Sequence, residues 1–370
     1  MPDARIVSSI VEIGREAWDR LFVGEVEAYD YLLTVERAGL SGFEYRYLVV
    51  EEAGRVLAGA PMFVTTYPLD TTLAASGRKV VEGARKVFPG LLTLRLACLG
   101  SPCTEGLPLG FAAEVDQTQK PVLLRLLLDA FEAEAARSRC GLMGLKDASE
   151  DQYPLWDMVA GTRDYRRIAG LPVAHMDISF DSVDAYLAGR SAATRKDMRR
   201  KLRNRAKVRV EWRNDLDGVL DRVMELYRQT LARADMTFED LTPAYFTGLS
   251  ETMGDRVQYV LYWSGEELLA MNLLLSGDDV LVDKFFVMDG EGGRALDLYF
   301  LSWFANIEHC LQNGIGRYHA GAAAYEVKRR LGSTLTGMGL YFRHRNRVLN
   351  GALNLAAPLF AADQGVKAAA

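Results

Sequence analysis

The sequence has few of the residues that build metal sites and disulfides. Only four cysteines and four histidines occur in 370 residues, and no two cysteines form a Cys-x-x-Cys pair. A zinc site has little to build on, so we predict no metal ligands. A chain of this length with so few cysteines does not depend on disulfides, which favours a cytoplasmic protein.

Long apolar runs are also missing. The first residues, MPDARIVSSIVEIGREAW, lack the apolar stretch of a signal peptide, and the longest uncharged run, 348–362, has 15 residues. A membrane-spanning helix needs about 20 residues, so we expect no span. Basic residues precede the run in YFRHRNRVLN, a pattern typical of segments that lie on a membrane surface. We therefore predict peripheral contact with the inner face of the membrane, with a packed helix as the alternative.

The chain has no excess of positive charge. It contains 44 Lys/Arg and 49 Asp/Glu, a net charge of −5, so we expect no DNA partner. Positive charge is concentrated in residues 190–209, which hold ten Lys/Arg and one Asp (+9), whereas the rest holds 34 Lys/Arg and 48 Asp/Glu (−14). The spacing of Met198, Leu202 and Ala206 predicts a helix with a narrow apolar stripe. Such a helix is either simply solvated or docks phosphates of a nucleotide cofactor, of lipids or of tRNA. No aromatic residues are interleaved, so stacking of bases is not expected.

A weak internal repeat sets the predicted architecture. YLVVEEAGRVLAGAPMFV from Tyr47 and YVLYWSGEELLAMNLLL from Tyr259 each predict a β-hairpin, and a strand, a long helix and a short strand follow each. We predict an α/β (α+β) chain of two tandem units, with one continuous domain as the alternative. The predicted parts are an N-terminal unit (1–175), a C-terminal unit (176–340) with a basic helix (190–206), and a basic and apolar tail (341–370).

The second half contains a basic helix from Arg195 to Arg205 and, further on, a stretch with Gly321, Tyr325 and Lys328. With these features it resembles the GNAT acyltransferases, especially the tandem-domain branch with the Fem aminoacyltransferases and the BioF2-like domains. It covers about residues 185–335, and the first half only by architecture. The resemblance implies two GNAT-like units, each a mixed, largely antiparallel sheet flanked by helices.

The stretches LGSPCTE, LYFLSWF and FRHRN further resemble bacterial ceramide synthases. This narrower resemblance implies an N-acyltransferase that moves a fatty acyl group from acyl-CoA, or from acyl carrier protein, to an amine-bearing lipid such as a sphingoid base. The alternative is a Fem-like enzyme that uses aminoacyl-tRNA to build peptidoglycan peptides. A non-catalytic binding protein on a GNAT scaffold is a third hypothesis.

A glycine-rich turn precedes the second long helix. In a GNAT fold the pyrophosphate of coenzyme A binds backbone N–H groups at this point, and the family pattern is Q/R-x-x-G-x-G/A. This chain has Gly290 where Gln or Arg would stand, so a turn that binds nothing is the alternative. The first half lacks such a turn before Pro121, which predicts that its unit is silent. The predicted cofactor contacts are Gly292, Gly293, Arg294 and Ala295.

Acyl transfer to an amine requires a base, donors for the oxyanion and an acid for the leaving group. His319, at the end of a short strand, is the leading base, because its ordinary pKa suits neutral pH. Tyr325 is the acid for the thiolate, and Glu326 is a second base candidate. Asp283 and Lys284 lie mid-strand, where alternation places them on opposite faces. A structural role is the alternative for several of these residues. His319 then only fills space in the packing, Glu326 and Lys328 are ordinary surface charges, and Asn272 caps a bulge. The other predicted site residues are Asp283 and Lys328 (catalytic) and Asn272, Lys284 and Tyr318 (substrate-binding).

Overall fold

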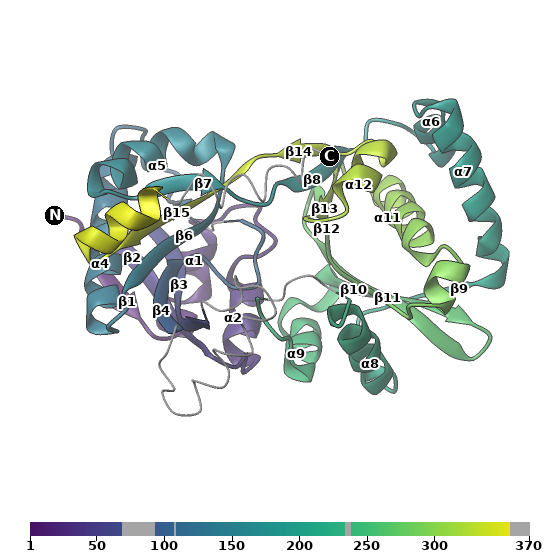
Figure 1. Ribbon diagram of the computed structural model, residues 1–370, viewed down its shortest axis with the longest axis horizontal. Coiled ribbons are helices and arrows are strands. Elements are labelled where there is room, and N and C mark those ends of the chain that lie inside the picture. Colours follow the sequence, from purple (N-terminus) through teal and green to yellow (C-terminus); the bar gives the residue numbers. More distant parts are fainter. Residues whose placement is uncertain (69–92, 107–108, 234–237, 356–370) are drawn as a thin grey trace. The chain divides into compact units, whose positions relative to one another are not determined.

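The computed structural model describes residues 1–68, 93–106, 109–233 and 238–355 (Figure 1). The chain forms two compact units. The first contains Met1–Val23, Ser41–Gly170 and the segment from Met338, and the second contains Gly24–Leu40 and Leu171–Gly337. The division near residue 170 lies close to the predicted one. The segment 24–40, which we assigned to the first unit, belongs to the second.

The first unit is built on an eight-stranded mixed sheet. Its strand order is β1-β2-β3-β4-β6-β15-β7, with β5 paired to β3. The predicted hairpin is formed by β2 and β3, and its turn residues Ala53 and Gly54 both have positive φ, as a tight two-residue hairpin turn requires. Strands β4 and β6 are parallel, with α4 as the crossover. The elements are β1 (Asp3–Val7), α1 (Arg15–Asp19), β2 (Phe43–Glu52), β3 (Arg55–Pro68), β4 (Thr93–Leu99), β5 (Gly110–Phe111), α4 (Lys120–Arg137), β6 (Leu142–Ser149), α5 (Tyr153–Ala160), β7 (Arg166–Ala169) and β15 (Met338–His344).

The second unit repeats this plan on a seven-stranded sheet. Its order is β14-β8-β13-β12-β11-β10-β9. The hairpin β10–β11 is followed by antiparallel β12, the long helix α11 and parallel β13, which confirms the predicted repeat. The elements are α2 (Tyr29–Arg37), β8 (Val173–Asp177), α6 (Val183–Ala188), α7 (Ala192–Leu202), β9 (Arg209–Arg213), α8 (Leu220–Leu231), α9 (Pro243–Met253), β10 (Val257–Ser264), β11 (Glu267–Ser276), β12 (Val280–Met288), α10 (Gly292–Ala295), α11 (Leu298–Asn313), β13 (Arg317–Gly321), α12 (Tyr325–Leu331) and β14 (Thr334–Thr336).

Helices cover both faces of the second sheet. In Figure 1, α11 with α6 and α7 lies on one side, and α8 and α9 lie on the other. Helix α2 joins the α9 layer, since the hydroxyls of Tyr31 and Tyr245 are 2.9 Å apart and Thr242 donates to Ala38 O at 2.6 Å. These polar contacts explain why a segment early in the sequence folds with the second unit.

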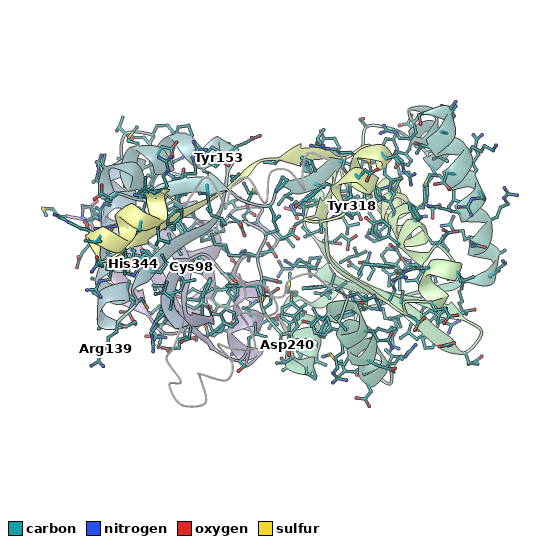
Figure 2. All side chains as sticks on the ribbon, in the orientation of Figure 1. Cys98, Arg139, Tyr153, Asp240, Tyr318 and His344 are labelled. Atoms are coloured by element: carbon teal, nitrogen blue, oxygen red, sulfur yellow. The ribbon has the colours of Figure 1, made fainter. Side chains whose placement is uncertain are left out.

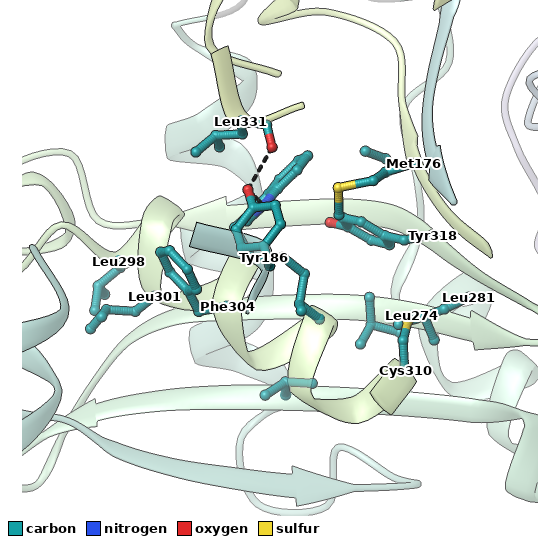
Figure 3. Packing of buried hydrophobic residues seen from close by; sticks show 14 of the residues in the cluster. Met176, Tyr186, Leu274, Leu281, Leu298, Leu301, Phe304, Cys310, Tyr318 and Leu331 are labelled. Atoms are coloured by element: carbon teal, nitrogen blue, oxygen red, sulfur yellow. Dashed lines mark hydrogen bonds between the residues drawn. The ribbon is translucent and has the colours of Figure 1, made fainter. Parts of the chain in front are cut away.

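The core beneath α11 is almost wholly apolar and is anchored by one buried tyrosine (Figure 3). Tyr186 donates to Leu331 O at 2.6 Å and accepts from Trp303 Nε1 at 3.1 Å. Burial raises the pKa of Tyr186 to about 12, so the phenol stays protonated and keeps its donor. This bridge fixes α6 and the end of α12 against the long helix.

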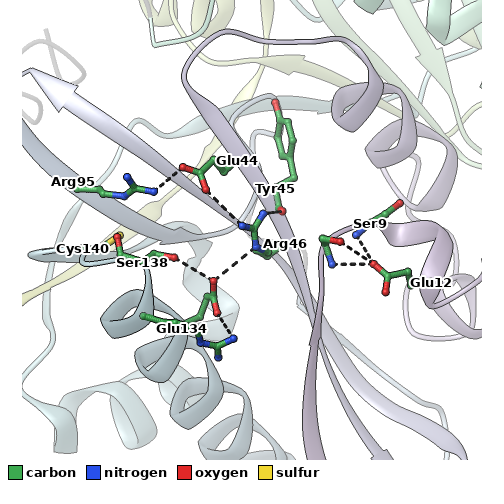
Figure 4. A network of polar contacts seen from close by, with 11 residues as sticks. Ser9, Glu12, Glu44, Tyr45, Arg46, Arg95, Glu134, Ser138 and Cys140 are labelled. Atoms are coloured by element: carbon green, nitrogen blue, oxygen red, sulfur yellow. Dashed lines mark hydrogen bonds and ion pairs between the residues drawn. The ribbon is translucent and has the colours of Figure 1, made fainter.

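In the first unit, a polar network holds α4 to the sheet (Figure 4). The Glu134 carboxylate lies 3.7 Å from Arg46 Nε and accepts from Ser138 Oγ at 3.1 Å. Arg95 donates to Glu44 at 2.6 Å, and Glu44 also pairs with Arg46. The buried Glu134 is therefore paired, as a buried charge requires.

The predicted C-terminal tail is corrected in its first part. Residues up to His344 form β15, which lies between β6 and β7, and Arg343 pairs with Glu132 at 2.9 Å. Beyond the strand, Val348 and Leu355 are 80% and 84% exposed, and residues 356–362 of the uncharged run lie outside the described residues. No helix in the described part of the chain is long and apolar enough to cross a membrane.

Candidate functional site

Two parallel strands separate at the centre of the second sheet. Strands β12 and β13 pair at only three positions, the last being Val282 with His319. Directly beyond this point β12 contains a bulge, because Leu273 faces Phe285 while Leu274 faces Asp283, which leaves Lys284 as the extra residue. Despite the bulge, the two neighbouring charged side chains lie on opposite faces of the sheet, as strand alternation predicts: Asp283 contacts Tyr318, and Lys284 contacts Glu27.

Asp283 heads a buried polar cluster on the α11 face, which we call the Asp283 cluster (Asn272, Asp283, Asn306 and Tyr318). Tyr318 donates to Asp283 Oδ2 at 2.6 Å. Asn306, from the middle of α11, donates to Asp283 Oδ2 at 3.2 Å and to Tyr318 OH at 2.9 Å, and it accepts from Asn272 Nδ2 at 3.3 Å. Asn272, Asn306 and Tyr318 are fully buried, whereas Asp283 is only partly buried. Tyr318 is labelled within the second unit in Figure 2. The carboxylate is therefore the accessible end of a buried hydrogen-bonded chain.

Tyrosines surround the carboxylate. Burial raises the pKa of Tyr318 and Tyr262 well above the ordinary value of 10, and the charge of Asp283 raises both further. The same two causes raise the pKa of Tyr299. All three phenols therefore stay protonated at neutral pH and are available as donors.

Three polar atoms next to this cluster have no hydrogen-bond partner among the residues that the structure describes. They are Asn272 Oδ1 and the hydroxyls of Tyr262 and Tyr299. Buried polar atoms are usually satisfied, because leaving one without a partner costs about 1–3 kcal/mol. Unsatisfied atoms around a partly accessible carboxylate are typical of a ligand site rather than of a structural core.

The opposite face of the sheet carries the other predicted polar residues of β12 and β13. Lys284, with a side chain that is 3% exposed, pairs with Glu27 at 2.5 Å and lies over the ring of Tyr31. Alternation along β13 directs His319 away from the face that Tyr318 occupies. The structure thus brings Asn272, Asp283 and Tyr318 together, and it separates His319 and Lys284 from them.

Lys328, another predicted catalytic residue, supports the loop after β13. The buried Lys328 ammonium donates to three carbonyl groups, those of Ala320 (2.5 Å), Gly321 (3.0 Å) and Ala322 (2.8 Å). The next two residues, Ala323 and Ala324, have positive φ, which is unfavourable for alanine. Lys328 therefore holds a strained loop and positions it. The two helix residues that follow differ in exposure: Tyr325 is half-buried and Glu326 is exposed.

The glycine-rich turn before α11 is closed by its own aspartate. Asp289 Oδ1 accepts from the backbone N–H groups of Glu291 (3.0 Å) and Gly292 (2.7 Å), and Asp289 O accepts from Gly293 N at 3.2 Å. A Cβ atom on Gly292 would lie 3.1 Å from Leu269, and one on Gly293 would lie 2.9 Å from Met288. Packing therefore explains both glycines. The predicted contacts Arg294 and Ala295 are exposed, and Ala295 N donates to Glu291 O.

The basic segment forms α7 and a following 3-10 turn (Arg203–Lys207). Some residues of this segment make contacts within the unit. Met198 is buried, Lys201 pairs with Asp197 at 3.3 Å, and Asn204 donates to Asp297 Oδ2 at 3.0 Å. Of the predicted stripe, Leu202 is partly buried but Ala206 is exposed, because the α-helix ends at residue 202.

The outer side of this segment carries four exposed cations, two on α7 and two in the 3-10 turn that follows it. Within the described part of the chain none of them has an ion-pair partner. We call these residues the basic stripe: Lys196, Arg199, Arg203 and Lys207.

Sequence reasoning missed several residues of the site. Asn306 lies in a long apolar helix, and the only signal in the sequence was a polar amide among apolar residues. Tyr262 and Tyr299 are indistinguishable in sequence from core aromatics. Glu27 comes from a segment about 250 residues away from its partner, and no local pattern reveals that contact.

The architecture is that of a tandem GNAT protein. The structure is similar to a tandem GNAT protein of the clavulanic acid biosynthesis pathway, solved without AcCoA, with a TM-score of 0.57 and 11% identity over 94% of this chain and 99% of that one. It is also similar to the crystal structure of FemX, with a TM-score of 0.61 and 13% identity over 95% of this chain and all of the other. Identities this low show the fold alone.

A family model assigns the chain more narrowly. Residues 101–349 match the FemAB-like family, which is described by peptidoglycan biosynthesis/recognition. The match covers more than half of the sequence, so the chain belongs to the FemAB-like family. These findings support a transferase of GNAT-like fold, and they give no support to the narrower resemblance to ceramide synthases. No curated protein sequence matches the chain.

Proposed function

We propose that this protein is a Fem-type transferase that moves an aminoacyl group from aminoacyl-tRNA to an amine of a peptidoglycan precursor. The family description names the biosynthetic context. The proposal favours the second of our sequence-based hypotheses over acyl-CoA-dependent transfer to a lipid amine. Two features of the second unit support this choice.

The basic stripe is the observation that carries the proposal. Two other cations of the same segment are neutralised: Lys201 by Asp197 and Arg205 by Glu308. The four outer cations have no carboxylate partner among the described residues, although the rest of the chain has a net charge of −14. A group of uncompensated cations on an acidic protein favours a polyanion, and an RNA backbone supplies repeated phosphates.

The closed turn before α11 argues against coenzyme A. A pyrophosphate would need the N–H groups that Asp289 already accepts, and it would have to approach the carboxylates of Asp289 and Asp297. Binding there would cost three existing hydrogen bonds and add like-charge repulsion. A donor whose anionic part binds elsewhere, as RNA would on α7, avoids both costs.

Asp283 supplies the chemistry in this proposal. The acceptor amine attacks the carbonyl carbon of the aminoacyl ester, a new C–N bond forms, and the C–O bond to the tRNA ribose breaks. Asp283 takes the proton that the nitrogen loses, and this proton passes to the departing ribose oxygen. Tyr318 and Asn306 hold the carboxylate by its Oδ2 atom, which orients it for transfer. Both act as positioning residues.

A paired transfer assay tests the proposal. The purified protein receives labelled aminoacyl-tRNA with a muramyl-peptide precursor, and in parallel palmitoyl-CoA with a long-chain amine. We expect label in the peptide product only. Product from palmitoyl-CoA alone would support the lipid hypothesis, and no product from either donor would favour a non-catalytic scaffold; both results contradict the proposal.

Matched variants locate the activity. Asp283→Asn should lower kcat by at least 100-fold because the proton acceptor is lost. Asp278→Asn, an exposed aspartate in the turn before the same strand, should leave kcat unchanged. Arg199→Glu/Arg203→Glu should raise KM for tRNA, whereas Arg228→Glu, an exposed arginine on α8 across the sheet, should not.

A further inference from the structure

A small hollow lies between the long helix and the edge of the second sheet. Its volume is about 160 Å³. On its wall the rings of Trp212, from the edge strand β9, and His309, from α11, are stacked with centroids 4.6 Å apart and an angle of 13° between their planes. The Trp212 side chain is still 38% exposed. The lining residues are Arg205, Val210, Trp212, Leu301, Ala305, Glu308, His309 and Gln312.

This aromatic pair is adjacent to the basic segment. Arg205, which belongs to the 3-10 turn after α7, lines the hollow and donates to Glu308 Oε1 at 2.8 Å. The last cation of the basic stripe, Lys207, is five residues before Trp212. Aromatic rings, which sequence reasoning did not find within the basic helix, are therefore supplied next to it by β9 and α11.

We propose that the stacked pair Trp212–His309 binds an unpaired base of RNA whose phosphates lie along the basic stripe. This inference rests on the proposed use of aminoacyl-tRNA, which carries its amino acid on a single-stranded 3′ end. An exposed indole backed by a second ring offers a flat face for stacking, and base stacking tolerates any base. Gln312, which also lines the hollow, has an amide donor and acceptor that suit the edge of a base better than an acyl chain.

The experiment compares two short RNA helices, one with four unpaired 3′ nucleotides and one with a blunt end. Fluorescence anisotropy of labelled RNA gives Kd for the full-length protein at several salt concentrations. For the wild type we expect tighter binding of the overhang RNA. Trp212→Ala should weaken that binding about 5- to 150-fold, the range for one lost stacked base, without changing the Kd of the blunt RNA. Trp212→Phe should retain most of the overhang preference.

Charge variants separate base stacking on the pair Trp212–His309 from phosphate binding by the basic stripe. Arg199→Glu/Arg203→Glu should weaken binding of both RNAs and reduce the slope of log K against log salt by about two. Equal binding of both RNAs by wild type and Trp212→Ala would overturn the stacking proposal. Competition by free AMP as strong as that by the overhang RNA would overturn it too, in favour of a nucleotide site. In either case the transfer assay with aminoacyl-tRNA still decides the proposed function independently.

Discussion

The substitution Asn306→Leu tests how the Asp283 cluster is held together. The Asn306 amide makes three hydrogen bonds, to Asp283, Tyr318 and Asn272. Leucine has a similar volume and makes none of them. A hydrogen bond to a carboxylate contributes about 1.5–3 kcal/mol and a neutral one about 0.5–1.5 kcal/mol. The added apolar burial offsets part of this loss, so we expect the free energy of unfolding of the second unit to fall by about 3 kcal/mol.

Removing the whole cluster should cost less than removing one member. The variant Asn272→Leu/Asp283→Leu/Asn306→Leu/Tyr318→Phe removes both partners of every hydrogen bond within the cluster. Replacing a complete buried polar group by apolar residues is often neutral or stabilising, whereas breaking one is costly. We therefore expect this variant to unfold at a higher urea concentration than Asn306→Leu.

Urea denaturation followed by circular dichroism and tryptophan fluorescence measures both variants. The slope with urea should match that of the wild type, which shows that the surface exposed on unfolding is unchanged. The reasoning is refuted if Asn306→Leu unfolds within about 0.5 kcal/mol of the wild type, which is the range of surface substitutions. It is also refuted if the fourfold variant is less stable than the single one.

Three further outcomes are expected. Tyr186→Phe removes the hydroxyl that bridges α6, α11 and α12 and should lower the free energy of unfolding by about 1–3 kcal/mol in the same urea assay. Burial lowers the pKa of His309 and His175 below the ordinary value of 6.5, so the unfolded chain binds their protons more readily and stability should fall as the pH drops through about 6.5. The thermal midpoint at pH 5.5 should therefore lie below that at pH 7.5, and by less in His309→Gln. Burial raises the pKa of Cys98 and Cys310 to about 12, so a thiol reagent at pH 8 should label neither until the protein is unfolded.

Local patterns in the sequence were sufficient to predict the repeated framework. The hairpins are visible because apolar strand residues flank tight turns such as Ala53-Gly54, where both residues have positive φ in the structure. The long helices are visible from their apolar period. The opposite directions of Asp283 and Lys284 followed from strand alternation alone, although a bulge lies between them.

Contacts between distant segments were not predictable in this way. The assignment of 24–40 to the second unit depends on hydrogen bonds such as Tyr31 to Tyr245, more than 200 residues apart. Asn306 reaches Asp283 only after α11 has packed on the sheet, and Trp212 stacks on His309 only after β9 has joined its edge. Each contact is fixed by tertiary packing, for which a single sequence carries no local signal.

The repeat itself shows that the fold does not require the Asp283 cluster. In the first unit, the corresponding helix α4 buries only apolar side chains from Leu123 to Phe131. Its buried carboxylate, Glu134, lies near the helix end, where Arg46, Arg137 and Ser138 pair with it. The second unit instead places an amide in the middle of the helix, against a partly accessible carboxylate and beside unsatisfied buried atoms. Since the first unit adopts the same architecture with apolar residues at this place, the buried polar cluster of the second unit is better explained by a ligand site than by the needs of folding.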